Sequence, residues 1–321
     1  MKATITISSC TVGGTTLTLA ADRRCELVTS RLVCVGDLVE DVVVWVEGVP
    51  RAGTDNAARV HRARGGAAAN VAVFASSLGT TVRFVGRVGD DAAGEALVGA
   101  LTAAGVDAKV QREGRTGTIV ILVDADGERT MFPDQAAAAQ LSGVPDAWIS
   151  GADAVHLSAY SLVGPPLRVL QRASEIARAE GAILTIDAAS VGLIDSIGPA
   201  IFRDLIRTLQ PTYIFANGIE AESCSLQELA GPGTTVVVKN GSEPTRVHLA
   251  ANRSVTVKVS PIDHVRDTTG AGDAFAAGFL SAVLDGADTV DAVEAGHLLA
   301  RRVLTEPGAA LTTEEGRTVG D

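Results

Sequence analysis

The chain has 321 residues, of which 46% are hydrophobic, 20% are charged and 3% are aromatic. This composition allows a large core and excludes an intrinsically disordered chain. The formal net charge of −11 argues against nucleic acid or an anionic membrane surface as the main partner, whereas a small anionic ligand needs only a locally positive pocket.

The sequence gives no sign of a disulfide framework, a zinc site or a membrane span. The cysteines form no C-x-x-C pair and the histidines have no H-x-x-x-H spacing. No apolar run reaches the roughly 18 residues of a membrane-spanning helix. Residues 1–30 lack the continuous apolar core of a signal peptide. These features predict a cytoplasmic protein with reduced thiols, at Cys10, Cys25, Cys34 and Cys224.

Strands and helices alternate from residue 31 onward. The apolar run 31–46 predicts two successive strands. Helices are expected over 68–79 and 93–105, each ending on a glycine, with a strand over 82–89 between them. The segment 117–132 contains two extended runs around "DADG", which is a hairpin signature. The hairpins predict a small β-structured flap in the N-terminal half.

The alternation becomes regular in the C-terminal half. Strands separated by helices predict a doubly wound, mainly parallel sheet that is covered on both faces. The expected strands are 154–159, 182–187, 213–218, 235–241 and 254–259, and the expected helices are 165–181, 201–210, a buried helix from Asp273 and 289–304.

A glycine-containing loop, "DTTGAGDAFAAGF" at 267–279, opens the buried helix. The first N–H groups of a helix lack internal partners, and Gly270 and Gly272 allow close backbone approach, so the loop suits a phosphate. A carboxylate at Asp273 would repel an anion, but it makes sense as a base that takes a proton from a hydroxyl attacking a phosphoryl group. The alternative interpretation is an aspartate that caps the helix after a glycine turn.

Together with four other stretches, this loop resembles the signatures of the ribokinase-like (PfkB) family of carbohydrate kinases. The resemblance covers roughly residues 31–311 and implies a three-layer α/β/α domain with a small β-sheet lid. It also implies ATP- and Mg²⁺-dependent phosphorylation of a hydroxyl on a small sugar or sugar derivative. The other stretches are "GDLVED" (36–41), "GGAAANVA" (65–72), "GRVGDDAAG" (86–94) and "NGIE" (217–220).

The resemblance also implies roles for individual residues. Asp273 would be the general base, and Glu220 would act on Mg²⁺ through water. Asp267 and the carbonyl of Thr269 match positions that bind a monovalent cation such as K⁺ in some members. The remaining assignments are the anion hole (Gly270, Ala271 and Gly272), the acceptor-sugar site (Asp41, Gly65, Gly66 and Asn70) and the nucleotide site (Asn217, Glu220, Lys239 and Gly241).

The expected domain organisation follows from these matches. The kinase domain spans 31–312, with a lid drawn from about 40–64 and 115–133. Residues 1–30 are an N-terminal extension of undecided structure, and 313–321 form a C-terminal tail. Lid strands often pair between subunits in this family, so a homodimer through the lid is expected beside the sugar and ATP as partners.

Two other functions remain open, and some residues depart from the family pattern. A nucleoside kinase of the same fold would need base-stacking aromatics, for which Phe132 and Tyr160 are available. A non-catalytic sugar- or nucleotide-binding protein would not need to retain Asp273. Pro244 stands where many members have a glycine near the nucleotide, and the strand end "HLSAYS" lacks the sugar-binding glutamate of ribokinase. The basic cluster 59–64 is expected to be a solvated loop, and the alternative is that it recognises a phosphate or carboxylate on the substrate.

Overall fold

The computed structural model of the protein describes residues 31–124, 128–250, 252–262 and 264–305. It also gives the backbone of four short strands nearer the ends of the chain. Most of the N-terminal extension and the C-terminal tail, Cys10 and Cys25, and the centre of the "DADG" turn lie outside the described residues. The four short strands are β1 (Thr11–Val12), β2 (Thr15–Thr16), β16 (Leu311–Thr312) and β17 (Thr318–Val319).

A nine-stranded sheet crosses the body of the protein in the order β15-β14-β13-β12-β11-β10-β3-β6-β7. From β13 to β7 each strand is parallel to its neighbours, and β14 and β15 add an antiparallel edge. The strands are β3 (Arg31–Val35), β6 (Thr81–Val88), β7 (Asp107–Arg112), β10 (Ala154–Ser158), β11 (Ile183–Asp187), β12 (Tyr213–Asn217), β13 (Thr235–Asn240), β14 (Glu243–Ala250) and β15 (Arg253–Val257).

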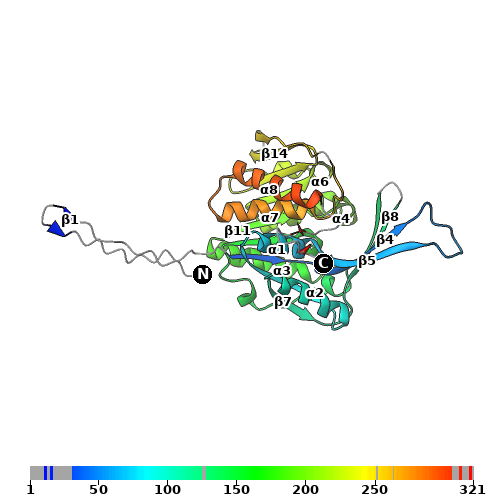
Figure 1. The fold of residues 1–321 in the computed structure, drawn as a ribbon. Helices are drawn as coiled ribbons and strands as arrows, with labels where there is room; N and C mark the ends of the chain where they lie inside the picture. The colour runs from blue at the N-terminus through cyan, green and yellow to red at the C-terminus, as the bar shows by residue number, and fades with distance from the viewer. Residues whose placement is uncertain are drawn as a thin grey trace.

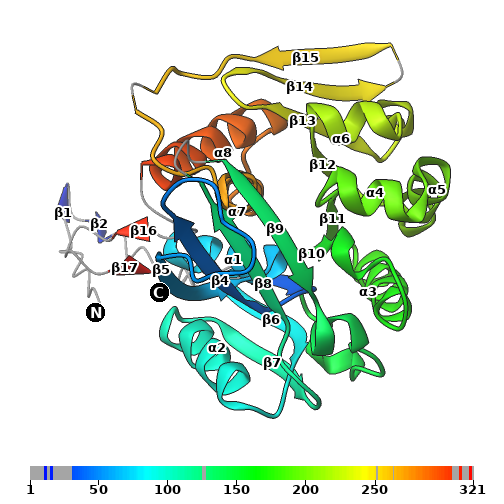
Figure 2. The ribbon, with the colours of Figure 1, turned by 90° about the vertical axis from the view of Figure 1, so that its right-hand side faces the viewer.

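Helices cover both faces of this sheet, as predicted (Figure 1; Figure 2). In Figure 2 α3, α4 and α5 lie to the right of β10–β12, and α7 and α8 lie to the left. The α-helices are α1 (Ala67–Ser77), α2 (Ala92–Ala103), α3 (Pro166–Glu180), α4 (Val191–Ile197), α5 (Pro199–Leu209), α6 (Gly218–Ser223), α7 (Ala271–Leu284) and α8 (Thr289–Leu304). Short 3-10 helices are Ala136–Gln140, Asp146–Trp148, Ala159–Ser161 and Leu226–Leu229.

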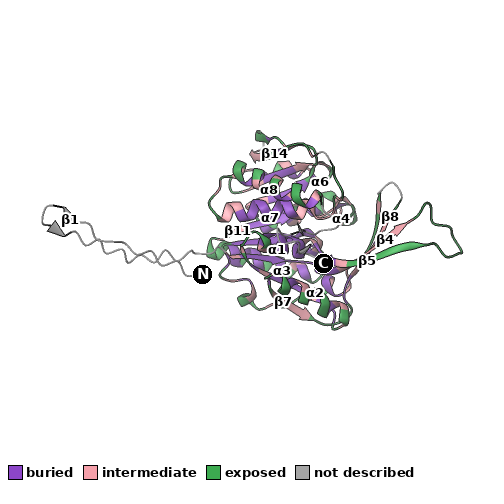
Figure 3. Ribbon diagram, viewed as in Figure 1, coloured by how far each residue is buried: buried purple, intermediate pink, exposed green. Residues whose placement is uncertain are grey.

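The core forms two layers because neighbouring residues of a strand point to opposite faces. In β3, Leu32 and Cys34 pack with α1, α7 and α8, whereas Val33 and Val35 pack with α3 and α5. Figure 3 shows buried residues concentrated in the body. The predicted three-layer α/β/α architecture is therefore confirmed. The thiols of Cys34 and Cys224 are free and buried.

A separate four-stranded sheet forms the lid, in the order β5-β4-β8-β9. It projects from the body towards the right in Figure 1 and is largely half-buried or exposed in Figure 3. Its strands are β4 (Val39–Val46), β5 (Ala58–Gly65), β8 (Thr118–Val123) and β9 (Arg129–Asp134).

The prediction of a solvated loop over 59–64 was wrong. These residues belong to β5, which pairs antiparallel with the whole of β4. Arg62 lies at the exposed part of the strand and pairs with Glu40, but Arg64 is buried where β5 enters the body. The basic residues made this segment resemble a loop, although it pairs as a strand with the apolar strand β4.

Several elements were not predicted, namely α4, β7 and β14. In β14, Thr245 and Val247 are buried between exposed or half-buried neighbours, so period-2 alternation was present. The proline at the second position of the strand made it resemble a loop. None of the described helices combines the length and apolar character needed to cross a bilayer.

Candidate active site

A cavity of about 890 Å³ opens at the carboxyl ends of β11, β12 and β13, beside α7 and α8. This is the edge of an open parallel sheet where ligands usually bind. The cavity brings together the predicted nucleotide residues and the predicted anion hole, which are far apart in sequence. Both groups line it: Asn217, Glu220, Lys239, Gly241, Gly270, Ala271, Gly272 and Asp273.

The amino end of α7 has the geometry expected of an anion site. Gly270 caps the helix in the left-handed conformation, with φ of 73°. Ala271 N–H donates to the Thr268 carbonyl at 3.3 Å, while the Gly272 and Asp273 amides lie in the first turn, where a helix supplies no carbonyl partner. A Cβ at position 272 would lie 3.2 Å from the Lys239 Nζ, so glycine leaves the ammonium group room beside these amides.

Asp273 occupies the first turn of α7 without capping it. The helix has no side-chain cap, and the Asp273 Oδ2 instead accepts a hydrogen bond from Asn70 Nδ2 at 2.8 Å. Burial raises the pKa of Asp273 to about 8; the Asn70 hydrogen bond opposes this shift, Asp187 adds to it and Lys239 opposes it. The capping interpretation of Asp273 is therefore not supported. A buried carboxyl group with a raised pKa is typical of a functional acid or base.

Asn70 connects Asp273 to the predicted acceptor residues. Its Oδ1 accepts a hydrogen bond of 2.6 Å from Arg64 Nη1. Asp41, on β4, is half-buried, and its Oδ1 is shielded from solvent and has no hydrogen-bond partner among the described residues. Burial raises the pKa of Asp41 to about 7, while Arg64 lowers it and Asp37 raises it further. A carboxylate oxygen that is shielded from solvent without a partner would be stabilised by a hydrogen bond from a hydroxyl group.

The glycine pair is required by the packing around Asp41 and Asp37. A Cβ on Gly65 would lie 2.1 Å from the Asp41 Oδ1. Gly66 has φ of 101°, which favours glycine, and a Cβ there would lie 2.4 Å from the Asp37 carbonyl oxygen. The two glycines thus allow the chain to pass from β5 to α1 through a tight turn, with Asp41 packed against that turn.

Two acidic residues at the site were not predicted. Asp187 ends β11 and accepts a hydrogen bond from the Lys239 Nζ at 2.8 Å. Burial lowers the pKa of Lys239, but the charge of Asp187 and its hydrogen bond raise it, and the net change is upward. The Asp37 carboxylate accepts the Ala67 N–H at 2.9 Å. Asp187 ends β11 and Asp37 closely follows β3. Ligands usually bind at the carboxyl ends of parallel strands, so this position in the sequence could have indicated both residues.

Asn217 and Glu220 form a reciprocal capping box at the start of α6. Glu220 accepts hydrogen bonds from the Asn217 N–H at 2.8 Å and from the Asn217 Nδ2 at 2.6 Å. Burial and the charge of Asp187 raise the pKa of Glu220. Within the described ranges, no group of three or more His, Cys, Asp or Glu residues could hold a metal directly. The donor set fits Mg²⁺ held through water and a nucleotide's phosphates.

Of the two predicted ligands of a monovalent cation, the Asp267 carboxylate is contacted by the lid, and at Thr269 the lid contacts the hydroxyl rather than the predicted carbonyl. Arg129, at the start of β9, forms an ion pair with Asp267 and donates a hydrogen bond to the Thr269 hydroxyl. The same Asp267 carboxylate accepts the Thr269 N–H at 2.7 Å. The positive charge beside Asp267 is thus supplied by the chain itself, which leaves little electrostatic demand for K⁺ there.

The remaining residues of interest lie near the cavity or on the lid. His297 lines the cavity, and its Nε2 lies 2.8 Å from the Thr245 hydroxyl oxygen, consistent with a packing role. Burial raises the pKa of Tyr160 to about 12, while Ser190 hydrogen bonding lowers it. Phe132 is exposed on β9. Asp91 of the "GRVGDDAAG" stretch caps α2 through the Gly94 N–H, as a structural residue would.

Comparison with known proteins places this site in a family. The sequence profile described as pfkB family carbohydrate kinase matches residues 29–315. A fructokinase from Solanum tuberosum is 30% identical over 268 residues, which cover 81% of this chain and 82% of that protein. An ATP-dependent ribose-1-phosphate kinase from Halopiger xanaduensis is 31% identical over 277 residues, covering 82% and 88% of the two chains.

Solved structures share the fold at lower identity. The adenosine kinase from Sinorhizobium meliloti superposes with a TM-score of 0.77 at 24% identity and covers 88% of this chain and 95% of its own. A Methanocaldococcus jannaschii nucleoside kinase gives a TM-score of 0.73 at 20% identity, with coverage of 87% and 93%. The chain is therefore a carbohydrate kinase of the pfkB family, with the ribokinase-like fold.

Proposed function

We propose that this kinase transfers the γ-phosphoryl group of ATP to a hydroxyl of a small sugar or sugar derivative, with Asp273 as general base. The observation that carries the proposal is the position of Asp273. Its carboxyl group lines the cavity at the anion-binding end of α7 and bonds to Asn70 on the acceptor side. A carboxylate there can take the hydroxyl proton while the acceptor oxygen attacks phosphorus.

The electrostatic environment of Asp273 suits a base. Burial makes the ionised form less stable and the group more basic, and its pKa of about 8 lies near physiological pH. A base is most effective when its pKa is close to the working pH. Of the predicted anion hole of Gly270, Ala271 and Gly272, the Gly272 amide would stabilise the charge that develops on the transferred group, because it is fixed in direction in the first turn of the helix, whereas the Ala271 N–H already donates to the Thr268 carbonyl.

The acceptor sugar is assigned to the side of the site formed by β4, β5 and α1. Asp41 would accept hydrogen bonds from sugar hydroxyls through its unpaired Oδ1, and Asn70 would bind the hydroxyl next to Asp273. Gly65 and Gly66 keep the backbone close to the sugar. The fructokinase and ribose-1-phosphate kinase relatives support a small sugar as the acceptor class.

ATP is assigned to the cavity between the strand ends and α8. Lys239 and Gly241 line it, and the Lys239 ammonium group lies close to Gly272, where it can balance phosphate charge. Asn217 and Glu220 would hold the waters of the magnesium ion. A magnesium ion held there would supply positive charge that offsets the negative charge of the phosphates.

K⁺ has no assigned role in this proposal. Asp267 and the Thr269 carbonyl were the expected ligands, but the Arg129 guanidinium already pairs with Asp267 and donates to the Thr269 hydroxyl. Arg129 then stabilises the loop before α7 in the way that a bound cation would.

A homodimer through the lid is supported by the outer lid surface. By register, Val42, Val120 and Phe132 lie side by side on the lid face opposite Asp41. Val60 on the same face is 61% exposed and Phe132 is 53% exposed. An apolar face on a thin sheet would be covered if two lids packed together.

The base assignment is tested by Asp273→Asn, which keeps size and removes basicity. Turnover should fall roughly 10²–10⁴-fold, while the affinity for ATP remains. ATP consumption with a panel of sugars and nucleosides first identifies the acceptor and also decides between a sugar kinase and a nucleoside kinase. The exposed Asp285, at the other end of α7, provides the control Asp285→Asn.

The pH dependence gives the second readout of the same variant. The base must be ionised, so wild-type kcat/KM should decline as the pH falls below the Asp273 pKa of about 8. The residual activity of Asp273→Asn should lack this limb. Turnover that is unchanged by the substitution would rule out Asp273 as the base.

The acceptor assignment is tested by Asp41→Ala. A hydrogen bond to a charged group contributes about 1.5–3 kcal/mol, so acceptor binding should weaken by at least about tenfold. Isothermal calorimetry with the identified acceptor and with ATP should show loss for the acceptor alone. Glu40→Ala is the control, because Glu40 pairs with the exposed Arg62. Equal loss for both ligands, or for neither, would contradict the assignment.

The cation assignment predicts that wild-type activity is the same in K⁺ and in tetramethylammonium salts. Arg129→Met should lower activity, and K⁺ should restore part of it by occupying the vacated charge site beside Asp267. Arg115→Met removes another arginine, one paired with Asp134 at the end of β9, and serves as the control. Strong stimulation of the wild-type enzyme by K⁺ would show that Arg129 does not replace the cation.

The dimer prediction is tested by light scattering. The wild-type protein should have twice the mass of one chain, and Phe132→Asp should shift it towards the monomer by placing a charge in the apolar lid face. Ile201→Asp, at an equally exposed apolar residue on α5, should leave the mass unchanged. A wild-type protein that is monomeric at micromolar concentration would exclude the lid interface.

A further inference from the structure

Arg64 is a buried cation that the proposed mechanism leaves without a role. It is only 3% exposed and lies next to the last residue of lid strand β5. Burial lowers the pKa of Arg64 to about 10, and the charges of Asp273 and Asp41 oppose the shift, so the guanidinium stays charged at neutral pH. Arginine is rarely buried without a definite partner.

The partner of Arg64 is the residue that binds the base. Arg64 Nη1 donates to Asn70 Oδ1 at 2.6 Å, and Asn70 Nδ2 donates to Asp273 Oδ2 at 2.8 Å. The three side chains come from the lid strand β5, from α1 and from α7. A continuous chain of hydrogen bonds therefore links Arg64, where the lid joins the body, through Asn70 to Asp273, the proposed general base.

The donor and acceptor capacity of each side chain determines the direction of the hydrogen bonds in this chain. A guanidinium group only donates hydrogen bonds, so the Asn70 side chain must turn its carbonyl oxygen towards Arg64. The amide nitrogen then necessarily faces Asp273, where it donates to the carboxylate. Without Arg64 the Asn70 amide could rotate by half a turn, and its oxygen would meet the Asp273 carboxylate with two acceptors facing each other.

We propose that Arg64 is a positioning residue: it fixes the orientation of the Asn70 amide, which in turn holds the Asp273 carboxylate towards the acceptor hydroxyl. The proposal rests on the proposed role of Asp273 as base. One Asp273 oxygen is bound by Asn70, and the other is left to take the proton. In this role Arg64 acts through Asn70, to which its Nη1 donates.

The charges around Asp273 determine what the loss of Arg64 does. Asp37 after β3 and Asp187 on β11 disfavour its ionised form, while Lys239 on β13 favours it. The attraction between Arg64 and Asp273 is mutual, and so is that between Arg64 and Asp41 on β4. Removing the guanidinium leaves Lys239 as the main compensating cation and also loosens the Asn70 donor. The ionised base therefore becomes harder to form.

The experiment compares Arg64→Met, Arg64→Lys and the control Arg62→Met in the full-length enzyme. Arg62 lies two residues earlier on the same strand, is exposed and pairs with Glu40. Arg64→Met should lower kcat about 10- to 100-fold, the range for loss of a charge-assisted hydrogen bond. The KM for ATP should change by less than about twofold, and the acid limb of the kcat/KM profile should move to higher pH. Arg64→Lys, which keeps a charged donor, should recover part of kcat.

A double-mutant cycle with Asn70→Ala tests the route of the effect. Once Asn70 is removed, Arg64→Met should cause little further loss of kcat. An equal loss in the presence and absence of Asn70 would overturn the proposal, as would an Arg64→Met enzyme with normal kcat. If Arg64→Met fails to fold, Arg64→Lys carries the same cycle. Asp273→Asn, measured separately, reports whether the base assignment itself holds.

Discussion

The proposed mechanism depends on one constraint: the Asp273 carboxyl group, which would have to ionise to act as the base, lies half-buried where its charge is disfavoured. Burial alone disfavours the charge of Asp273, and two nearby carboxylates, Asp37 and Asp187, disfavour it further. The compensation comes from a directed donor, Asn70, and from the Lys239 ammonium group. Each of these two groups is itself held by a hydrogen bond to a second residue. Arg64 donates to Asn70, and Lys239 donates to Asp187.

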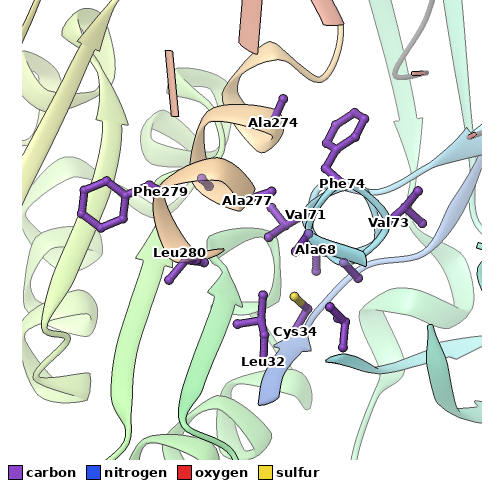
Figure 4. Packing of buried hydrophobic residues seen from close by; sticks show 14 of the residues in the cluster. Leu32, Cys34, Ala68, Val71, Val73, Phe74, Ala274, Ala277, Phe279 and Leu280 are labelled. Carbon is purple, nitrogen blue, oxygen red and sulfur yellow. The ribbon is translucent and has the colours of Figure 1, made fainter. Parts of the chain in front are cut away.

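Small residues make this arrangement geometrically possible. In Figure 4, Val71 of α1 lies beside Ala274 and Ala277 of α7, above Leu32 and Cys34 of the sheet. Alanine at the contact allows the two helices to approach closely, and this approach brings Asn70 within hydrogen-bond distance of Asp273, 203 positions later in the chain.

The sequence was informative where local chemistry and chain order carry the signal. The glycine loop with Asp273 and the stretch around Asn70 were recognised as short patterns, and the alternation of strands and helices predicted the three-layer fold. Arg64, Asp187 and Arg129 were missed because their roles depend on partners that lie far away in sequence. Arg64 resembled a solvated basic residue, since nothing local indicates that β5 enters the core at that point.

The ion pair between Arg129 and Asp267 links the lid to the loop that opens α7. Its two members lie in segments that could otherwise change independently, one at a lid hairpin and the other in the loop before the glycine cap of α7. Exchange of either residue alone removes this pairing of opposite charges in a largely enclosed position. Among descendants of this sequence, positions 129 and 267 should therefore change together, so that a neutral residue at one accompanies a neutral residue at the other.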